Sequence, residues 1–234
     1  GNESYGKPVS PRNDKIGGGT SSQNPSISSN GGGGRQLDIT PNIVFTFNDD
    51  EIENLIAKKS IMERFDQNIA AIVMAKELTR TSRKATVEEK SILALYRGWG
   101  GLSEIFESYS SRDRRVKLKE LITEDEYKSV KRSTLSAYYT NPLIAKKMWE
   151  GLERMGLKGG VGLDPAFGTG NFASSTPESL LENISIFGKE IDSLTAEIAS
   201  HIHGGMITNE GYEDKETAFQ KRIETVKKGN STNY

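Results

Sequence analysis

A glycine-rich loop between a short apolar strand and a helical segment is the feature that most constrains this fold. The apolar residues at 161–163 predict a short buried strand, and Gly168 and Gly170 lie in the loop that follows it. Apolar runs at 184–187 and 206–208 predict two more strands, with a helical pattern before each of them. Strands that alternate with helices predict an α/β fold built on a parallel, doubly wound sheet.

Local signals predict where the helices around this sheet begin and end. Asn141 and Pro142 combine a cap residue with proline at the first helical position. Asp192 predicts the start of a later helix, which Gly204 should end. A last amphipathic helix is expected at 215–228. The helix after Pro142 is expected to bury one face, formed by Ile144, Met148, Leu152 and Met155.

The residues before the sheet predict two further segments. Residues 1–36 are rich in glycine and serine and poor in bulky apolar residues, so we expect a flexible, disordered lead-in or linker. Residues 37–135 predict a mainly helical unit that begins with a short extended element at 37–47. Thr86 with Glu89, and Thr123 with Glu126, have the form of capping boxes and predict two helix starts. The α/β segment then occupies 136–234.

Composition excludes several classes of protein. The formal net charge is −1, which gives no general electrostatic case for binding nucleic acid. A basic run at 112–119 is interpreted as a solvated helix face in preference to a phosphate contact. The chain has no cysteine, and therefore neither disulfides nor a thiolate metal site. No apolar stretch reaches membrane-spanning length, so a cytoplasmic protein with no membrane partner is expected.

Two acidic residues mark a candidate ligand site at the carboxyl ends of the predicted strands, where parallel sheets bind their ligands. Asp164 ends the first strand, and Glu190 ends the second. Gly168 and Gly170 would let the loop backbone approach a ligand closely. An acid in the position of Glu190 can accept hydrogen bonds from a ribose diol, although a surface acid is the plain alternative. Pro165 and Asp164 do not fit a dinucleotide fingerprint, so nicotinamide binding ranks low.

Three motifs follow one another in this part of the chain: Tyr138-Tyr139-Thr140-Asn141-Pro142, Asp164-Pro165-Ala166-Phe167-Gly168-Thr169-Gly170-Asn171-Phe172 and Gly188-Lys189-Glu190-Ile191-Asp192. Their order resembles that of N6-adenine DNA methyltransferases that use S-adenosylmethionine (SAM). Upstream residues at 64–102 and 133–140 are similar to the N-terminal part of the large methylase–helicase proteins of phages, plasmids and conjugative elements. The resemblance covers roughly residues 60–213, and Gly98-Trp99-Gly100-Gly101 and the cofactor motifs are its most specific parts.

This resemblance implies a Rossmann-like, incomplete methyltransferase sheet and a role for each motif. Tyr139, Thr140 and Pro142 would shape the methionine end of SAM. Asp164 and the loop at 166–170 would hold its amino-acid part, and Glu190 would bind the ribose hydroxyls. Ile191 and Tyr212 would flank the adenine, with Gly211 in the place where related enzymes often carry an acid. The cofactor-binding residues implied are Tyr139, Thr140, Pro142, Asp164, Pro165, Ala166, Phe167, Gly168, Thr169, Gly170, Asn171, Phe172, Glu190, Ile191 and Tyr212.

The motif that would carry the chemistry is not found in this sequence. The family polarises the amine of a flipped adenine with an Asn/Asp-Pro-Pro-Tyr motif or an Asn-Val-Pro-Phe variant, and neither occurs at 213–234. The catalytic residues are therefore unknown. We expect the α/β domain to be truncated, and this chain alone to be inactive without a catalytic or helicase portion or a partner chain. DNA is the partner that the resemblance implies for the full-length protein.

A second hypothesis is a non-catalytic protein of a mobile element that binds DNA or a protein, for example against restriction, and keeps the fold as a scaffold. It predicts salt-sensitive DNA binding that is lost when Arg112, Arg114 and Arg115 are neutralised. Other candidates are weaker. His201 and His203 could bind a metal but do not face each other on a helix, so no metal site is expected. Trp99 is expected in the core rather than stacked on a base.

Overall fold

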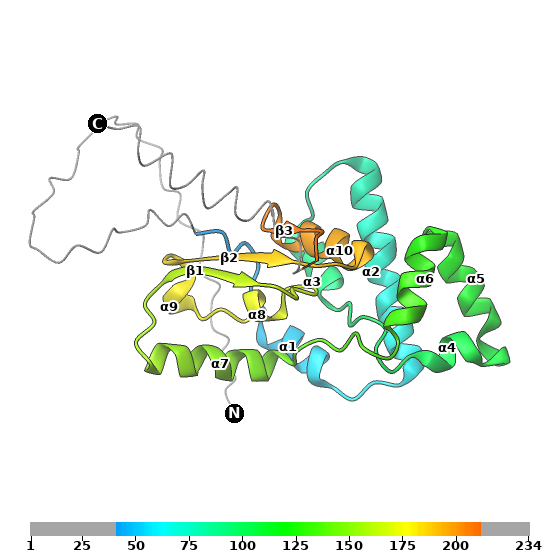
Figure 1. Cartoon of the computed structure of the whole chain (residues 1–234), viewed down its shortest axis with the longest axis horizontal. Coiled ribbons are helices and arrows are strands. Elements are labelled where there is room, and N and C mark those ends of the chain that lie inside the picture. Colours follow the sequence, from blue (N-terminus) through cyan, green and yellow to red (C-terminus); the bar gives the residue numbers. More distant parts are fainter. Residues whose placement is uncertain (1–40, 212–234) are drawn as a thin grey trace, which may run out of the picture. The chain divides into compact units, whose positions relative to one another are not determined.

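The computed structural model describes residues 41–211, which form seven α-helices and one short 3-10 helix followed by a small sheet and its helices (Figure 1). The predicted lead-in at 1–36, Tyr212 and the predicted helix at 215–228 lie outside this range. The helices are α1(Asp49–Ile56), α2(Ile61–Thr81), α3(Val87–Ala94), α4(Ser103–Glu107), η1(Tyr109–Ser111), α5(Arg112–Leu121) and α6(Glu124–Ser133), then α7(Pro142–Arg154), α8(Asn171–Ser174), α9(Glu178–Leu181) and α10(Ser193–His203). The strands are β1(Gly160–Asp164), β2(Ile184–Lys189) and β3(Ile207–Thr208).

The sheet is parallel, with strand order β1-β2-β3. This confirms the predicted α/β class and the predicted parallel pairing. Asp164 pairs with Gly188, and Gly188 in turn pairs with Ile207, so the carboxyl ends of the strands lie together. β3 pairs only with Gly188 and Lys189 of β2. At Ile186 of β2, the side chain of Asn42 takes the place of a strand: its amide donates to Ile186 O and accepts from Ile186 N, both at 2.8 Å. The expected extended element at 37–47 therefore forms no strand in its described part, 41–47.

The four helix starts predicted from local signals are confirmed, at α3, α6, α7 and α10. Asn141 caps α7 with Pro142 in its first turn, and Asp192 caps α10, which ends at Gly204. Each capping box joins the N-cap side chain to the backbone of the third helical residue, whose own side chain bonds back to the cap. Four such boxes are present: Asn48 with Glu51, Ser60 with Glu63, Thr86 with Glu89, and Thr123 with Glu126.

Two predictions about burial are wrong. Met148 is 51% exposed and Met155 is 84% exposed, because α7 turns Ala145 and Trp149 toward the core instead. The spacing of apolar residues predicts the helix correctly, but it does not determine which of two neighbouring faces of the helix is buried. In β1, Val161 is 44% exposed, because alternate residues of an edge strand face away from the helices that cover the other side.

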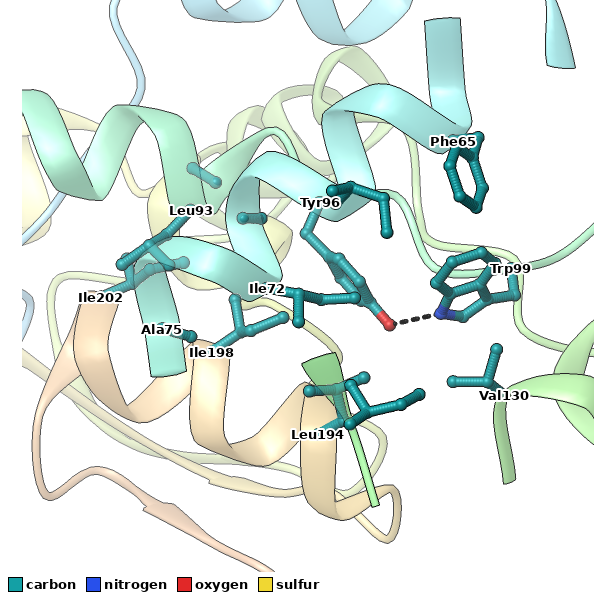
Figure 2. Packing of buried hydrophobic residues seen from close by; sticks show 14 of the residues in the cluster. Phe65, Ile72, Ala75, Leu93, Tyr96, Trp99, Val130, Leu194, Ile198 and Ile202 are labelled. Atoms are coloured by element: carbon teal, nitrogen blue, oxygen red, sulfur yellow. Dashed lines mark hydrogen bonds between the residues drawn. The ribbon is translucent and has the colours of Figure 1, made fainter. Parts of the chain in front are cut away.

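One hydrophobic cluster joins the helices before residue 136 to helix α10, which follows β2. Leu194, Ile198 and Ile202 of α10 pack with residues of α2 and α3, and all three are fully buried (Figure 2). The indole N–H of Trp99 donates to the Tyr96 hydroxyl at 2.9 Å inside this cluster. Trp99 is 1% exposed, which confirms its predicted place in the core. Residues 41–211 accordingly belong to one compact unit by their contacts.

A second cluster supports the sheet. Ile184 and Ile186 of β2 point to the same face and pack with Trp149 of α7 and Ala199 of α10. The Trp149 ring stacks on Phe172 of α8 at 4.5 Å between centroids, and its N–H donates to Phe172 O. This packing fixes α8, and with it the glycine-rich loop at the end of β1. Within residues 41–211, no helix is both long enough and apolar enough to cross a membrane.

Candidate functional site

The carboxyl ends of β1 and β2 place two carboxylates beside one cavity. Asp164 is the last residue of β1, and Glu190 directly follows β2. Asp164 Oδ1 accepts the backbone N–H of Ala166 at 3.1 Å, whereas its second oxygen has no hydrogen-bond partner among residues 41–211. Asp164 lines the cavity, so a ligand with a donor group could bind this oxygen.

Glu190 ties the two loops at these strand ends together. One carboxylate oxygen accepts the N–H of Gly168 at 2.8 Å, and the other accepts the N–H of Asp192 at 2.9 Å. A carboxylate can accept about four hydrogen bonds, so each oxygen keeps one acceptor position for a ligand. The backbone of Phe167 also donates to Lys189 O at 2.9 Å, which holds the glycine loop against β2.

The glycine loop requires its two glycines for different reasons. Gly168 has a φ of +56°, a backbone conformation that favours glycine. A Cβ there would make only an ordinary contact with the Tyr139 ring, at 3.4 Å. Gly170 has a φ of +84°, and a Cβ there would lie 2.4 Å from His203 Nε2 and 2.6 Å from the Phe167 ring. Any side chain at Gly170 would therefore displace the residues under the loop.

His203 supports this loop from below. The residue is 2% exposed, and its Nε2 lies 3.1 Å from Thr169 O. A carbonyl oxygen can only accept, so Nε2 carries the proton and donates. Nδ1 is then a buried acceptor with no hydrogen-bond partner among the residues that the structure describes. Burial is the main reason that the pKa of His203 falls to about 4, because a second ring proton would be a buried donor without an acceptor.

Two tyrosines form the wall opposite the glycine loop. The Tyr139 hydroxyl lies 3.1 Å from Thr195 Oγ1 of α10, and its ring centroid is 6.2 Å from that of Tyr96. Burial raises the pKa of Tyr139 well above its ordinary value, so the phenol stays neutral. Asn171 at the start of α8 donates to Thr140 O at 2.9 Å, which joins this wall to the loop.

Backbone contacts bring the segment before α7 to the same cavity. The N–H of Gly100 donates to Ala137 O at 3.1 Å, and that of Gly101 donates to Thr134 O at 2.8 Å. A Cβ at Gly100 would lie 2.3 Å from Ala137 O, so only glycine permits this approach. The helical part of the chain therefore contributes directly to the site.

The cavity enclosed by these elements has a volume of about 320 Å³, at the lower end of the range for small-molecule sites. Ten of the fifteen residues that the sequence analysis singled out line it: Tyr139, Thr140, Asp164, Ala166, Phe167, Gly168, Thr169, Asn171, Phe172 and Glu190.

The remaining five candidates are placed elsewhere. Pro142 is buried at the start of α7. Pro165 lines a neighbouring cavity, which shares Thr140, Asp164, Ala166 and Phe172 with the first. Gly170 lies under the loop, as described above. Ile191 is 75% exposed and does not line the cavity. Tyr212 lies outside the described residues, so its predicted role stays a prediction.

Burial dominates the electrostatics of the two carboxylates. It raises the pKa of Asp164 and that of Glu190 above their ordinary values, while backbone N–H groups act in the opposite direction. Asp192 lies close by and adds a like charge that raises the pKa of Glu190 further. Among the described residues, the lining of this cavity has half-buried carboxylates and no lysine or arginine, which suits a ligand with a positive group and hydroxyl donors.

Several lining residues were not predicted as site residues. They are Tyr96, Gly98, Trp99, Ser133, Ser136, Ala137, Tyr138, Asp192 and Thr195. The signal that could have found most of them was the upstream part of the resemblance, which includes the Gly98-Trp99-Gly100-Gly101 motif. No local pattern places a helical segment beside a distant glycine loop.

The two histidines serve different contacts. His201 Nε2 lies 2.9 Å from Thr79 Oγ1 at the surface, whereas His203 faces the core. Within residues 41–211, no cluster of three or more histidine, aspartate or glutamate side chains could hold a metal ion.

Comparison with known proteins adds no assignment, because no protein-family model, curated protein or solved structure matches this chain.

Proposed function

We propose that this chain is a SAM-binding module related to DNA adenine-N6 methyltransferases, with a Rossmann-like sheet. The observation that carries the proposal is the pair Asp164 and Glu190 at the ends of adjacent parallel strands, on one cavity closed by a glycine loop. The motif resemblance supplies the identity of the ligand. When bound, SAM supplies an electrophilic methyl group on a sulfonium.

The residues fit the chemistry of that ligand. Asp164 offers one desolvated carboxylate oxygen without a partner, which suits the ammonium group of the methionine part. Glu190 keeps an acceptor position on each oxygen, which suits the two ribose hydroxyls. Tyr139 and Thr140 would form the wall along the methionine end.

The direct test is calorimetry of the purified chain with SAM and with S-adenosylhomocysteine. We expect binding that Glu190→Ala weakens at least tenfold, since each lost charge-assisted hydrogen bond contributes about 1.5–3 kcal/mol. Glu190→Gln should weaken SAM binding less than Glu190→Ala does, because the amide oxygen of glutamine can still accept a hydrogen bond from one loop N–H. Glu178→Ala, at an exposed acid of α9, serves as the control.

Three outcomes of this test are informative. Absence of heat at millimolar ligand, with Glu190→Ala equal to wild type, would refute the cofactor proposal. Unchanged thermal unfolding of Glu190→Gln would show that a loss of affinity is not a loss of fold. Binding of nicotinamide dinucleotides in place of SAM would favour the dinucleotide alternative.

The non-catalytic alternative keeps the fold and dispenses with the cofactor. The structure weakens its original test, because Arg115 donates to Ile105 O and Ser108 O at 2.7 and 2.6 Å. Neutralising Arg115 would therefore disturb the packing of α4 and α5 as well as the surface charge. An informative test of DNA binding requires cations that do not hold the fold together.

A further inference from the structure

A second cavity, of about 350 Å³, adjoins the proposed cofactor cavity through the segment 137–140. We refer to it as the cationic groove, because Lys58, Lys59, Arg64 and Arg97 all line it and no carboxylate does. The two cavities share six lining residues: Tyr96, Ala137, Tyr138, Tyr139, Thr140 and Asn171. A ligand chain in the groove would therefore run beside the cofactor cavity.

The positive charge of this groove is not neutralised by the protein. None of its four cations forms an ion pair with a carboxylate in residues 41–211. Glu63 lies near Lys59, but its carboxylate caps α2 by accepting from the backbone and hydroxyl of Ser60, both at 2.8 Å. An anion that enters the groove meets unpaired cations.

The two arginines are held rigidly on backbone carbonyls. Arg64 donates to Gly100 O at 2.5 Å, and Arg97 donates to Asn54 O and, at 3.4 Å, to Ala57 O. Carbonyls orient a guanidinium without cancelling its charge. Burial, and then the charge of Arg64, lowers the pKa of Arg97, although a guanidinium stays protonated. An anion would relieve this crowding of like charges.

An exposed aromatic ring adds a second kind of contact. Tyr138 is 68% exposed and lines both cavities. A Cβ at Gly101 would lie 3.6 Å from Arg64 Nη1 and 3.9 Å from the Tyr138 hydroxyl, which places this ring close to the groove's cations. Cations along a groove with an accessible aromatic ring are the combination that binds single-stranded nucleic acid, through phosphates and base stacking.

We propose that the cationic groove binds the phosphodiester backbone of single-stranded nucleic acid and that Tyr138 stacks on one of its bases. The proposal rests on the proposed function for the choice of nucleic acid as the partner. Binding in the groove does not itself require the cofactor, so the two ideas can fail separately.

The basic run on α5 is the natural comparison surface. Arg115 is bonded to two carbonyls as described above, and Lys119 lies over the Tyr127 ring at 4.5 Å. Arg112 and Lys117 are exposed and form no ion pair among the described residues. They provide a control pair that removes the same charge from a surface that lines neither cavity.

The experiment measures fluorescence anisotropy of a labelled oligothymidylate of about 20 nucleotides with the full 234-residue chain, between about 50 and 200 mM salt. We expect the double variant Lys58→Ala, Lys59→Ala to raise Kd roughly tenfold or more at the lower salt. The slope of log Kd against log salt should fall by about 1.4, the value for two lost single-strand phosphate contacts. The double variant Arg112→Ala, Lys117→Ala should keep the wild-type slope.

Further arms identify the ligand and separate the two proposals. Tyr138→Ala should raise the Kd for single-stranded oligonucleotides at least threefold and leave the Kd for duplexes unchanged. Equal competition by polyglutamate would indicate an acidic polypeptide site and overturn the proposal, as would an absence of oligonucleotide binding or equal slopes in both double variants. SAM calorimetry on Lys58→Ala, Lys59→Ala should match wild type. Oligonucleotide binding without SAM binding would refute the cofactor proposal alone.

Discussion

Acidification is expected to destabilise this protein in part through one buried side chain, the imidazole of His203. Its pKa is about 4 in the folded chain, against an ordinary value of 6.5. Between these two pH values, the imidazole of His203 is protonated in the unfolded chain and neutral in the folded chain. The contribution to stability is therefore complete above pH 6.5 and is lost as the pH falls toward 4.

The size of this effect follows from the difference in pKa. One unit corresponds to about 1.4 kcal/mol, so the full contribution of His203 is about 3 kcal/mol. Integrated between pH 7 and pH 5, the free energy of unfolding should fall by about 2 kcal/mol from this residue. A loss of this size is a large part of the stability of an ordinary domain.

The assay is urea unfolding of wild type and of His203→Gln at pH 7, 6 and 5. The glutamine amide can still donate to Thr169 O but does not titrate, so the difference between the two profiles isolates His203. Asp164 and Glu190, whose raised pKa values give the opposite trend in acid, are common to both proteins. Equal losses in the two proteins, within about 0.5 kcal/mol, would show that the reasoning about His203 is wrong.

Two further substitutions test the packing around the site. Tyr96→Phe removes the acceptor of the buried Trp99 indole N–H, and it should lower the free energy of unfolding by about 1–3 kcal/mol; an unchanged denaturation midpoint would contradict this. Gly100→Ala places a Cβ 2.3 Å from Ala137 O. It should lower the free energy of unfolding, measured by thermal unfolding, by about 1–3 kcal/mol. Its control is Gly151→Ala in α7, where no atom lies within 4 Å of the new Cβ; equal effects would exclude the steric explanation.

Much of the fold could be predicted because its signals are local. A capping box needs only four consecutive residues, so Thr86 and Thr123 marked the starts of α3 and α6 correctly. The strand–loop–helix order after Gly160 is likewise encoded within a few residues. The parallel pairing then followed from the alternation of strands and helices.

The errors arose where tertiary packing decides. The period of α7 is compatible with two adjacent stripes, and only the position of Phe172 on α8 determines that Trp149, not Met148, faces inward. The helical wall of the cavity depends on the approach of Gly100 to Ala137, a contact between residues 37 positions apart. The support of the glycine loop by His203 could not be expected, because a helix-end histidine has many possible environments.

The Asn42 amide that pairs with both polar groups of Ile186 has a consequence for association. An unpaired strand edge is a template for intermolecular pairing, and proteins protect such edges with side chains or loops. Asn42 protects the backbone of β2 where β3 is too short to reach. Among residues 41–211, β1 and β3 each pair with β2 alone, so the outer edge of each has no strand partner. Strand addition to this sheet is therefore directed to its two outer edges, and not to the part of β2 that Asn42 occupies.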